Sequence, residues 1–165
     1  MSVKRIISGG QTGVDRGALD AAMILGVAHG GWCPHGRLAE DGQIPDQYHL
    51  VEAESADYAV RTKLNVMDAD GTLILHLGPL SGGTELTRRL CVKHHRPHWL
   101  VDLDASPDAA SVLYWLDEQQ IEVLNVAGPR GSALAGLNVI ARDFLLQVFH
   151  DMSQFSTSLL EFTID

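Results

Sequence analysis

The chain has 165 residues, of which 45% are hydrophobic and 20% are charged, and its formal net charge at pH 7 is −9. This length and composition are typical of one globular domain with a substantial hydrophobic core. The acidic balance argues against a general nucleic-acid-binding surface, which requires a basic face.

The first segment predicts a buried strand, a glycine turn and a helix, in that order. Ile6 and Ile7 form a short apolar run, and the Ala- and Leu-rich segment after the turn predicts a helix from Gly13 to Leu25, with Thr12 as its N-cap. Such a helix directs free N–H groups at whatever occupies the turn, and phosphates are common occupants. The sequence GGQTG matches neither GxGxxG nor the Walker A pattern, so a tightly packed strand–helix connection is the alternative. The candidate ligand residues here are Gly9, Gly10, Gln11, Thr12 and Gly13.

A long polar loop follows the second predicted strand. We place this strand near Gly30–Cys33, and the loop runs from Pro34 to Pro45. Long loops within a compact domain are usually functional or mobile. Arg37 lies in this loop without an obvious helical partner, and its guanidinium suits a phosphate, so it is a candidate ligand residue. Leu50–Tyr58 has no clear preference, and Arg61–Asp70 is predicted as a helix.

A second unit of strand, glycine turn and helix occupies the middle of the chain. Thr72–Leu77 is predicted as a buried strand, and helical spacing resumes from Leu86 to Cys91. Pro97 ends this helical region, and His98–Leu103 is the next predicted strand. The turn between the first strand and the helix contributes the candidate ligand residues Ser81, Gly82, Gly83 and Thr84.

A third such unit completes the chain. Ser106 as N-cap and Pro107 as first helical residue predict a helix that ends near Gln120. Ile121–Val126 is then a strand, and apolar spacing predicts a helix over Ala133–His150. The turn between them contributes the candidate ligand residues Gly128 and Arg130.

Strands that alternate with helices predict an α/β fold, here a Rossmann-like three-layer sandwich with a mainly parallel sheet. With the five predicted strands numbered along the chain, we expect the order 2-1-3-4-5. This order places the turns after strands 1 and 3 side by side, at the crevice where such folds bind ligands. We expect residues 1–150 to form a single ligand-binding domain. Residues 151–165 are then a tail, with an edge strand at Leu159–Ile164 or a contact in an oligomer.

Other titratable side chains have structural explanations. Arg16 and Arg88 are expected to form surface ion pairs from their helices. Three histidines between residues 94 and 98 straddle a predicted helix end, where the dipole favours them, and no cluster of Cys or carboxylates adjoins them. We therefore predict no tightly bound metal ion. Glu85 suits either general acid–base catalysis or the first turn of its own helix.

The sequence shows neither a secretory signal nor a membrane-spanning run nor a disulfide framework, and our expectations for compartment and membrane contact rest on this. The apolar run near the N-terminus is too short for a secretory signal, and no run approaches the length that spans a bilayer. Cys33 and Cys91 do not make a disulfide framework. We expect a reduced, cytoplasmic protein without membrane contact.

Five distinctive stretches occur in order along the chain: SGGQTGVDRGALDAA, GWCPHGRLAEDG, RTKLNVMDADGTLIL, GPLSGGT and LNVAGPR. Together they resemble the molybdenum carrier protein family, which is related to the molybdenum cofactor carrier proteins of green algae and, more widely, to the Rossmann-like lysine-decarboxylase-like group. The resemblance extends from about residue 4 to about residue 148. It implies a Rossmann-like fold, a homo-oligomer, expected as a tetramer, and binding of molybdenum cofactor without turnover.

The family's ligand loops fall on positions already chosen, which are Gly9–Gly13, Arg37, Ser81–Thr84 and Gly128–Arg130. The related enzymes carry a longer PGGxGTxxE motif, whereas this chain has LSGGTE, with Arg88 near the place of the later glutamate. We therefore predict a carrier for a small, anionic, phosphate-bearing ligand, more a binding protein than an enzyme. Two alternatives stay open: a nucleotide-binding enzyme that cleaves the glycosidic bond of a nucleoside monophosphate with Glu85, and an interaction module with purely structural loops.

Overall fold

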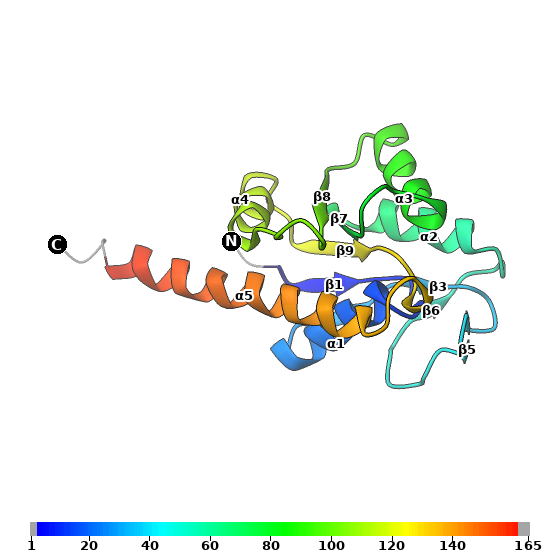
Figure 1. The fold of residues 1–165 in the computed structure, drawn as a ribbon. Helices are drawn as coiled ribbons and strands as arrows, with labels where there is room; N and C mark the ends of the chain where they lie inside the picture. The colour runs from blue at the N-terminus through cyan, green and yellow to red at the C-terminus, as the bar shows by residue number, and fades with distance from the viewer. Residues whose placement is uncertain (1–2, 162–165) are drawn as a thin grey trace.

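The computed structural model describes residues 3–161, and it describes side chains as far as residue 153. A five-stranded sheet lies between helices on its two faces (Figure 1). The strands are β1 (Arg5–Ile7), β2 (Ala28–Gly30), β3 (Trp32–Cys33), β4 (Leu38–Ala39), β5 (Gly42–Gln43), β6 (Val51–Glu52), β7 (Gly71–His76), β8 (His98–Asp102) and β9 (Val123–Ala127). The helices are α1 (Val14–Leu25), α2 (Tyr58–Asp68), α3 (Gly82–Lys93), α4 (Ala109–Glu118), the 3-10 helix η1 (Gly131–Ala133) and α5 (Leu137–Glu161).

The central sheet is parallel throughout and has the order β2-β1-β9-β7-β8. In the view of Figure 1, α1 packs against α5 below the sheet and α2 packs against α3 above it. This arrangement confirms the predicted α/β class and the Rossmann-like three-layer sandwich. Two separate two-stranded sheets pair β3 with β6 and β4 with β5.

The predicted strand order is wrong because it misplaces one strand, β9. In chain order the sheet strands are β1, β2, β7, β8 and β9, so the observed order is 2-1-5-3-4 instead of 2-1-3-4-5. β9 lies between β1 and β7, where its residues Leu124, Asn125 and Val126 are buried. β8 forms the edge, where Trp99 and Leu100 remain 38% and 41% exposed. A strand that is buried on both faces and paired on both sides, as β9 is, belongs at the centre of a parallel sheet. The position of β9 as the last strand along the chain does not reveal this central place.

The second predicted strand divides into two strands of different sheets. β2 ends at Gly30 and belongs to the central sheet, whereas β3 begins at Trp32 and pairs with β6. Gly31 lies between them with a φ of 121°, and a Cβ at Gly31 would collide with the carbonyl oxygen of Ser8. Because this backbone conformation suits glycine alone, Gly31 turns the chain out of the central sheet.

Two helices do not have the predicted N-caps. The N-cap of α1 is Gly13 without a side-chain hydrogen bond, because the Thr12 hydroxyl accepts a hydrogen bond from the backbone N–H of Gly131 (3.0 Å). The N-cap of α4 is Asp108, whose carboxylate accepts a hydrogen bond from a backbone N–H of the helix (3.0 Å). Ser106, the predicted N-cap, instead has a left-handed φ of 51°. Tertiary contacts therefore decide the helix start in α1.

The last helix is longer than predicted. α5 runs from Leu137 to Glu161 because no Gly or Pro between His150 and Glu161 ends it. The predicted strand at Leu159–Ile164 is therefore wrong for residues 159–161, and residues 162–164 lie outside the described residues. The predicted domain boundary at residue 150 falls inside α5, and an oligomer contact of the tail stays a prediction. Among the described residues, no helix is long and apolar enough to cross a membrane.

Close packing around β9 extends into the turn that follows it. A Cβ at Gly128 would collide with the carbonyl oxygen of Leu75 and would lie 2.7 Å from Cγ2 of Val14. Both of these neighbours belong to the buried hydrophobic core. The turn after β9 can therefore lie against β7 and α1 only because residue 128 has no side chain.

We expect Gly128→Ala to lower the free energy of unfolding by about 2 kcal/mol, because the new methyl group must displace backbone of the core. For a chain of this length this loss corresponds to a fall in melting temperature of about 5 °C, measurable by calorimetry. The matched control is Gly83→Ala, because a Cβ at Gly83 meets nothing within 4 Å. Equal melting temperatures for the two variants would contradict the close-packed turn.

Candidate functional site

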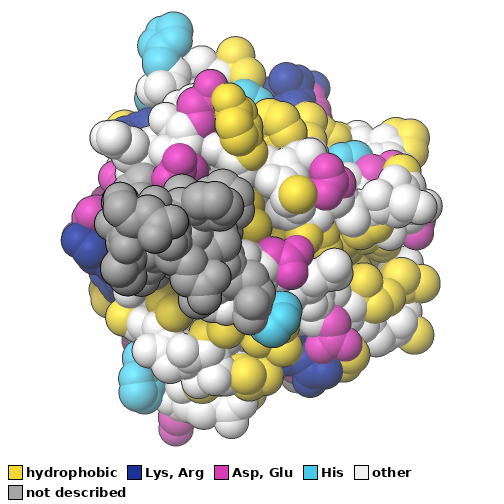
Figure 2. All heavy atoms as spheres, turned by 90° about the vertical axis from the view of Figure 1, so that its left-hand side faces the viewer, with side chains coloured by type: hydrophobic (Ala, Val, Ile, Leu, Met, Phe, Trp, Pro, Cys, Tyr) yellow, Lys and Arg dark blue, Asp and Glu magenta, His cyan; other side chains and the backbone are white. Residues whose placement is uncertain are grey.

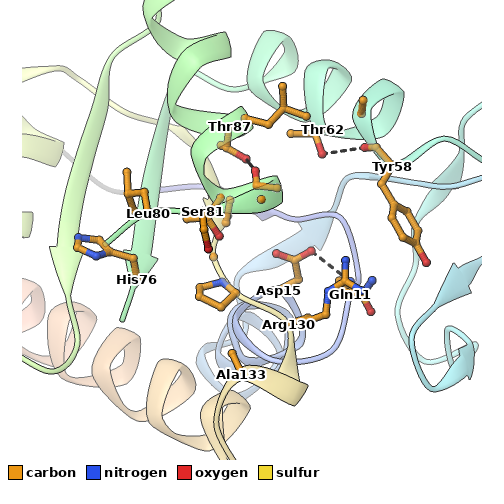
Figure 3. A pocket seen from close by; sticks show the side chains of 18 of the residues that line it. Gln11, Asp15, Tyr58, Thr62, His76, Leu80, Ser81, Thr87, Arg130 and Ala133 are labelled. Carbon is orange, nitrogen blue, oxygen red and sulfur yellow. Dashed lines mark hydrogen bonds between the residues drawn. The ribbon is translucent and has the colours of Figure 1, made fainter. Parts of the chain in front are cut away.

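A cavity of about 610 Å³ opens at the carboxyl ends of β1, β7 and β9, between their turns and the start of α2 (Figure 3). It brings together seven of the predicted ligand residues, which are Gln11, Ser81, Gly82, Gly83, Thr84, Gly128 and Arg130. It also includes polar residues that are not among the predicted ligand residues, such as Asp15, Tyr58, Arg61 and His76. The turn after β9 lies between the other two turns, so the change in strand order leaves them in one cavity.

The N-terminus of α3 forms one wall of the cavity. Its N-cap is Ser81, and no side chain caps the first turn of the helix. Gly82 has a φ of 52°, and a Cβ at either Gly82 or Gly83 would meet nothing within 4 Å. The first backbone N–H groups of α3 have no partner inside the helix, and the residues that carry them line the cavity together with the positive end of the helix dipole, as in an anion site.

Gln11 contributes a buried amide to the opposite part of the cavity. Its Oε1 accepts hydrogen bonds from the backbone N–H groups of Thr12 (3.0 Å) and Glu40 (2.9 Å). Its Nε2 is buried and has no hydrogen-bond partner among the residues that the structure describes. Gln11 as a whole is only 6% exposed. The side chain thus holds an unsatisfied donor at the cavity wall.

Asp15 and Arg61 form a buried charged pair beside Gln11. One carboxylate oxygen of Asp15 accepts a hydrogen bond from Gln11 N (3.1 Å) and lies 3.9 Å from Nη2 of Arg61. Burial raises the pKa of the Asp15 carboxyl, and the Arg61 charge and the loop hydrogen bonds offset part of this rise. The Arg61 guanidinium lies over Gly9, where a Cβ would come within 2.6 Å of Cζ. Gly9 therefore makes room for Arg61.

Arg130 and Tyr58 form the outer part of the same wall. The guanidinium carbon of Arg130 lies 5.9 Å from the centre of the Tyr58 ring, and that of Arg61 lies 5.6 Å from it. Such distances allow cation–π attraction, which holds both arginines near the cavity. The side chain of Arg130 is 50% exposed, and its Nε lies 4.0 Å from Glu40. Arg130 is therefore free to reach an anion at the cavity mouth.

The remaining predicted residues of the first turn support the cavity without lining it. Gly9 lies beneath Arg61, and a Cβ at Gly10 would come within 3.0 Å of Ile44. Thr12 accepts the hydrogen bond from Gly131 described above and donates one to Glu40. Gly13 has a φ of 81° and lies against the turn after β9. These residues determine how closely the two turns approach.

The structure does not bring Arg37 to the cavity. Its guanidinium donates hydrogen bonds to the backbone carbonyls of Ile44 (3.2 Å), Pro45 (3.0 Å) and Tyr48 (2.8 Å). The long polar loop folds back on itself, and Arg37 satisfies carbonyl groups that would otherwise lack partners. Its role here is to hold the loop.

Glu85 also does not line the cavity. Its carboxylate accepts two hydrogen bonds from Arg88 (2.8 and 2.7 Å) and one from Arg89 (3.1 Å). The hydrogen bonds from Arg88, and to a smaller extent the one from Arg89, lower the pKa of Glu85 to about 2. Glu85 is therefore ionised at neutral pH and is held on the surface of α3 by its neighbours.

Fold and site together define a Rossmann-like α/β protein with a ligand cavity at the carboxyl edge of its parallel sheet. The chain belongs to the circularly permutated YpsA SLOG family, whose model matches residues 6–149. It is also similar to the solved structure of a "Putative molybdenum carrier protein" from Syntrophus aciditrophicus SB. The two chains share 42% identity with a TM-score of 0.83, over 89% of this chain and 94% of that one. These findings confirm the resemblance to molybdenum carrier proteins. No functionally curated protein matches the chain.

The charge of Asp15 should make stability depend on pH. Because the folded state raises the pKa of Asp15 above its ordinary value of 3.8, folded protein binds a proton that unfolded protein has released. The stability of the wild type relative to Asp15→Asn should therefore fall as pH rises from about 4 through the native pKa, and then level off. Urea unfolding between pH 4 and 8 measures this difference.

The exposed Asp46→Asn variant controls for the change in net charge in this experiment. A stability difference between wild type and Asp15→Asn that does not change with pH would contradict the burial effect on Asp15.

Proposed function

We propose that this protein binds and carries a phosphate-bearing ligand, with the phosphate at the N-terminus of α3. The observation that supports this most is the uncapped start of α3 at Gly82 and Gly83, which faces open space within a cavity that also contains Arg130 and Arg61. Backbone N–H groups give directed hydrogen bonds to phosphate oxygens, and the two guanidinium groups add positive charge.

Molybdenum cofactor is the ligand we consider first, and a nucleotide is the alternative. The similarity to a protein named as a molybdenum carrier favours molybdenum cofactor. The cavity volume lies in the range typical of sites for organic ligands rather than single ions. Among the described residues, no cluster of three or more His, Cys, Asp and Glu side chains could hold a metal ion. We propose that the protein contacts such a cargo through hydrogen bonds to its oxygen atoms.

Binding fits the geometry better than cleavage of a glycosidic bond. An enzyme of that class needs a carboxyl group at the reacting bond. Glu85 lies outside the cavity, and its carboxylate accepts hydrogen bonds from Arg88 and Arg89. Asp15 does line the cavity, but it is already bound by Gln11 N and lies near Arg61. We therefore propose a carrier.

Removing one backbone donor should weaken phosphate binding. Gly83→Pro deletes a first-turn N–H that the helix does not use internally, and proline is tolerated in a first turn. We expect the affinity for AMP to fall about tenfold or more, the effect of losing one hydrogen bond to a charged group. Isothermal calorimetry measures this change, and Gly83→Ala, which retains the N–H, should bind within about twofold of the wild type.

Equal AMP affinity in Gly83→Pro and Gly83→Ala would count against phosphate binding at α3. Chromatography of the same samples distinguishes a carrier from an enzyme. A carrier leaves AMP intact, and this is the result we expect. Release of adenine that is lost in Glu85→Gln would instead support the glycosidic-bond enzyme.

We further propose a cytoplasmic homo-oligomer, with a tetramer as the expected form. Exposed hydrophobic side chains occur in several places on the face seen in Figure 2. Among the side chains that the structure describes, Ile24 and Tyr114 are strongly exposed, at 62% and 72%. Contiguous apolar patches at a surface often mark a contact with another protein. Figure 1 also shows the C-terminal part of α5 extending past the sheet.

Native mass spectrometry of protein purified from its own host should give a multiple of the 17.9 kDa subunit mass, with four subunits expected. The same spectra report the mass of any bound ligand. A subunit mass alone at micromolar concentration would contradict the oligomer.

A further inference from the structure

The cavity contains a second set of hydrogen-bond donors, apart from the N-terminus of α3. Figure 3 shows Ser81 and Gln11 on either side of Asp15. We propose that the ligand carries two oxyanion groups, one held at α3 and the second held by Gln11 and Arg61. This inference rests on the proposed function, because it assumes that α3 takes the first group.

The orientation of the Gln11 amide is determined by its neighbours. Two backbone N–H groups, of Thr12 and Glu40, donate to Oε1, and a flipped amide would place its own N–H groups against them. Nε2 is therefore the atom that lacks a partner in the described part of the chain. A buried donor without a partner is unfavourable, and because Gln11 lines the cavity, a ligand acceptor is the partner we infer for it.

Arg61 adds a second buried donor to this set. Its Nη1 donates to Oγ1 of Thr62 (3.1 Å), and its Nη2 lies 3.9 Å from Asp15. Its Nε is buried without a hydrogen-bond partner in the described part of the chain. Asp15 acts as a positioning residue, since it binds the Gln11 backbone and faces the Arg61 guanidinium.

The free donors of Gln11 and Arg61 indicate which chemical group the second site binds. Gln11 Oε1 already accepts two hydrogen bonds, so Gln11 and Arg61 together offer two donors that lack partners among the described residues, one of them on a guanidinium whose charge is shared with Asp15. Charge-assisted hydrogen bonds from such donors are strongest to carboxylate and phosphate oxygens. A single phosphate fills the volume of only a few waters, about 30 Å³ each, and therefore leaves most of the 610 Å³ cavity empty.

Matched pairs of anions test this proposal by calorimetry. Glycerol 3-phosphate and 3-phosphoglycerate differ by a carboxylate, and fructose 6-phosphate and fructose 1,6-bisphosphate differ by a phosphate farther away. We expect the wild type to bind the doubly anionic member of at least one pair about tenfold more tightly. Gln11→Glu keeps the acceptor at Oε1 and replaces Nε2 with an oxygen, so it should abolish this preference. Single-phosphate compounds should still bind within about threefold.

Two further variants complete the experiment. Gln119→Glu adds the same charge at an exposed position outside the cavity and should retain the preference. Arg61→Lys retains a positive charge near Asp15 but lacks Nε–H, and it should lose the preference even if Gln11→Glu does not fold.

A wild type that binds both members of both pairs equally would overturn the second oxyanion site and leave phosphate binding at α3 intact. A preference that persists in Gln11→Glu and Arg61→Lys would also overturn it. If none of the four compounds binds the wild type, phosphate binding at α3 fails as well, and the inference fails with it.

Discussion

The site depends on the close approach of two backbone turns, those that follow β1 and β9. A Cβ at Gly13 would lie 2.5 Å from the carbonyl oxygen of Pro129 and 2.6 Å from Gly131 N. In the space that this glycine leaves, Val14 N donates to Pro129 O (3.2 Å) and Gly131 N donates to Thr12 (3.0 Å). These contacts exist because β9 pairs directly with β1. They place the turn that contains Arg130 beside Gln11. They also join the turns after β1 and β9, which form two walls of the cavity, into one hydrogen-bonded unit.

The long polar loop between β3 and β6 reinforces this unit from outside. Glu40 accepts hydrogen bonds from the backbone and hydroxyl of Ser132 (2.9 and 2.8 Å), and its own N–H donates to Gln11. Asp41 binds the guanidinium of Arg16 through both of its oxygens. The loop thus reaches the turns after β1 and β9 and holds the Gln11 amide in one orientation. Glu40 and Asp41 therefore help to determine the shape of the cavity, and Arg37, for which the sequence predicted contact with a ligand, holds the loop instead.

Local signals in the sequence predicted most elements and the three glycine turns, because apolar periodicity and glycine reflect nearby backbone. They did not predict the strand order, which depends on how strands bury one another. They selected Arg37 as a ligand residue and did not select Arg61, since the backbone carbonyls that bind Arg37 belong to a loop whose path the sequence does not reveal. Asp15 was not predicted as a site residue, because an acidic residue in the first turn of a helix is already explained by its interaction with the helix dipole. The pairing of Asp15 with Arg61 is visible only after folding.

The polar groups left without partners distinguish a binding site from a structural loop cluster. A turn that serves only packing satisfies its own donors, because a buried donor without a partner costs about 1–3 kcal/mol. Here the Nε2 of Gln11 and the Nε of Arg61 are both buried and unpaired among the described residues, and α3 begins without a side-chain cap. The side chain of Arg130 is 50% exposed, and its Nε lies 4.0 Å from Glu40, which is too far for a hydrogen bond, so its donors stay available to a ligand. A purely structural interaction module explains none of these three features. An anionic ligand would supply acceptors to all of them at once, which is why binding of such a ligand should add to the stability of the fold.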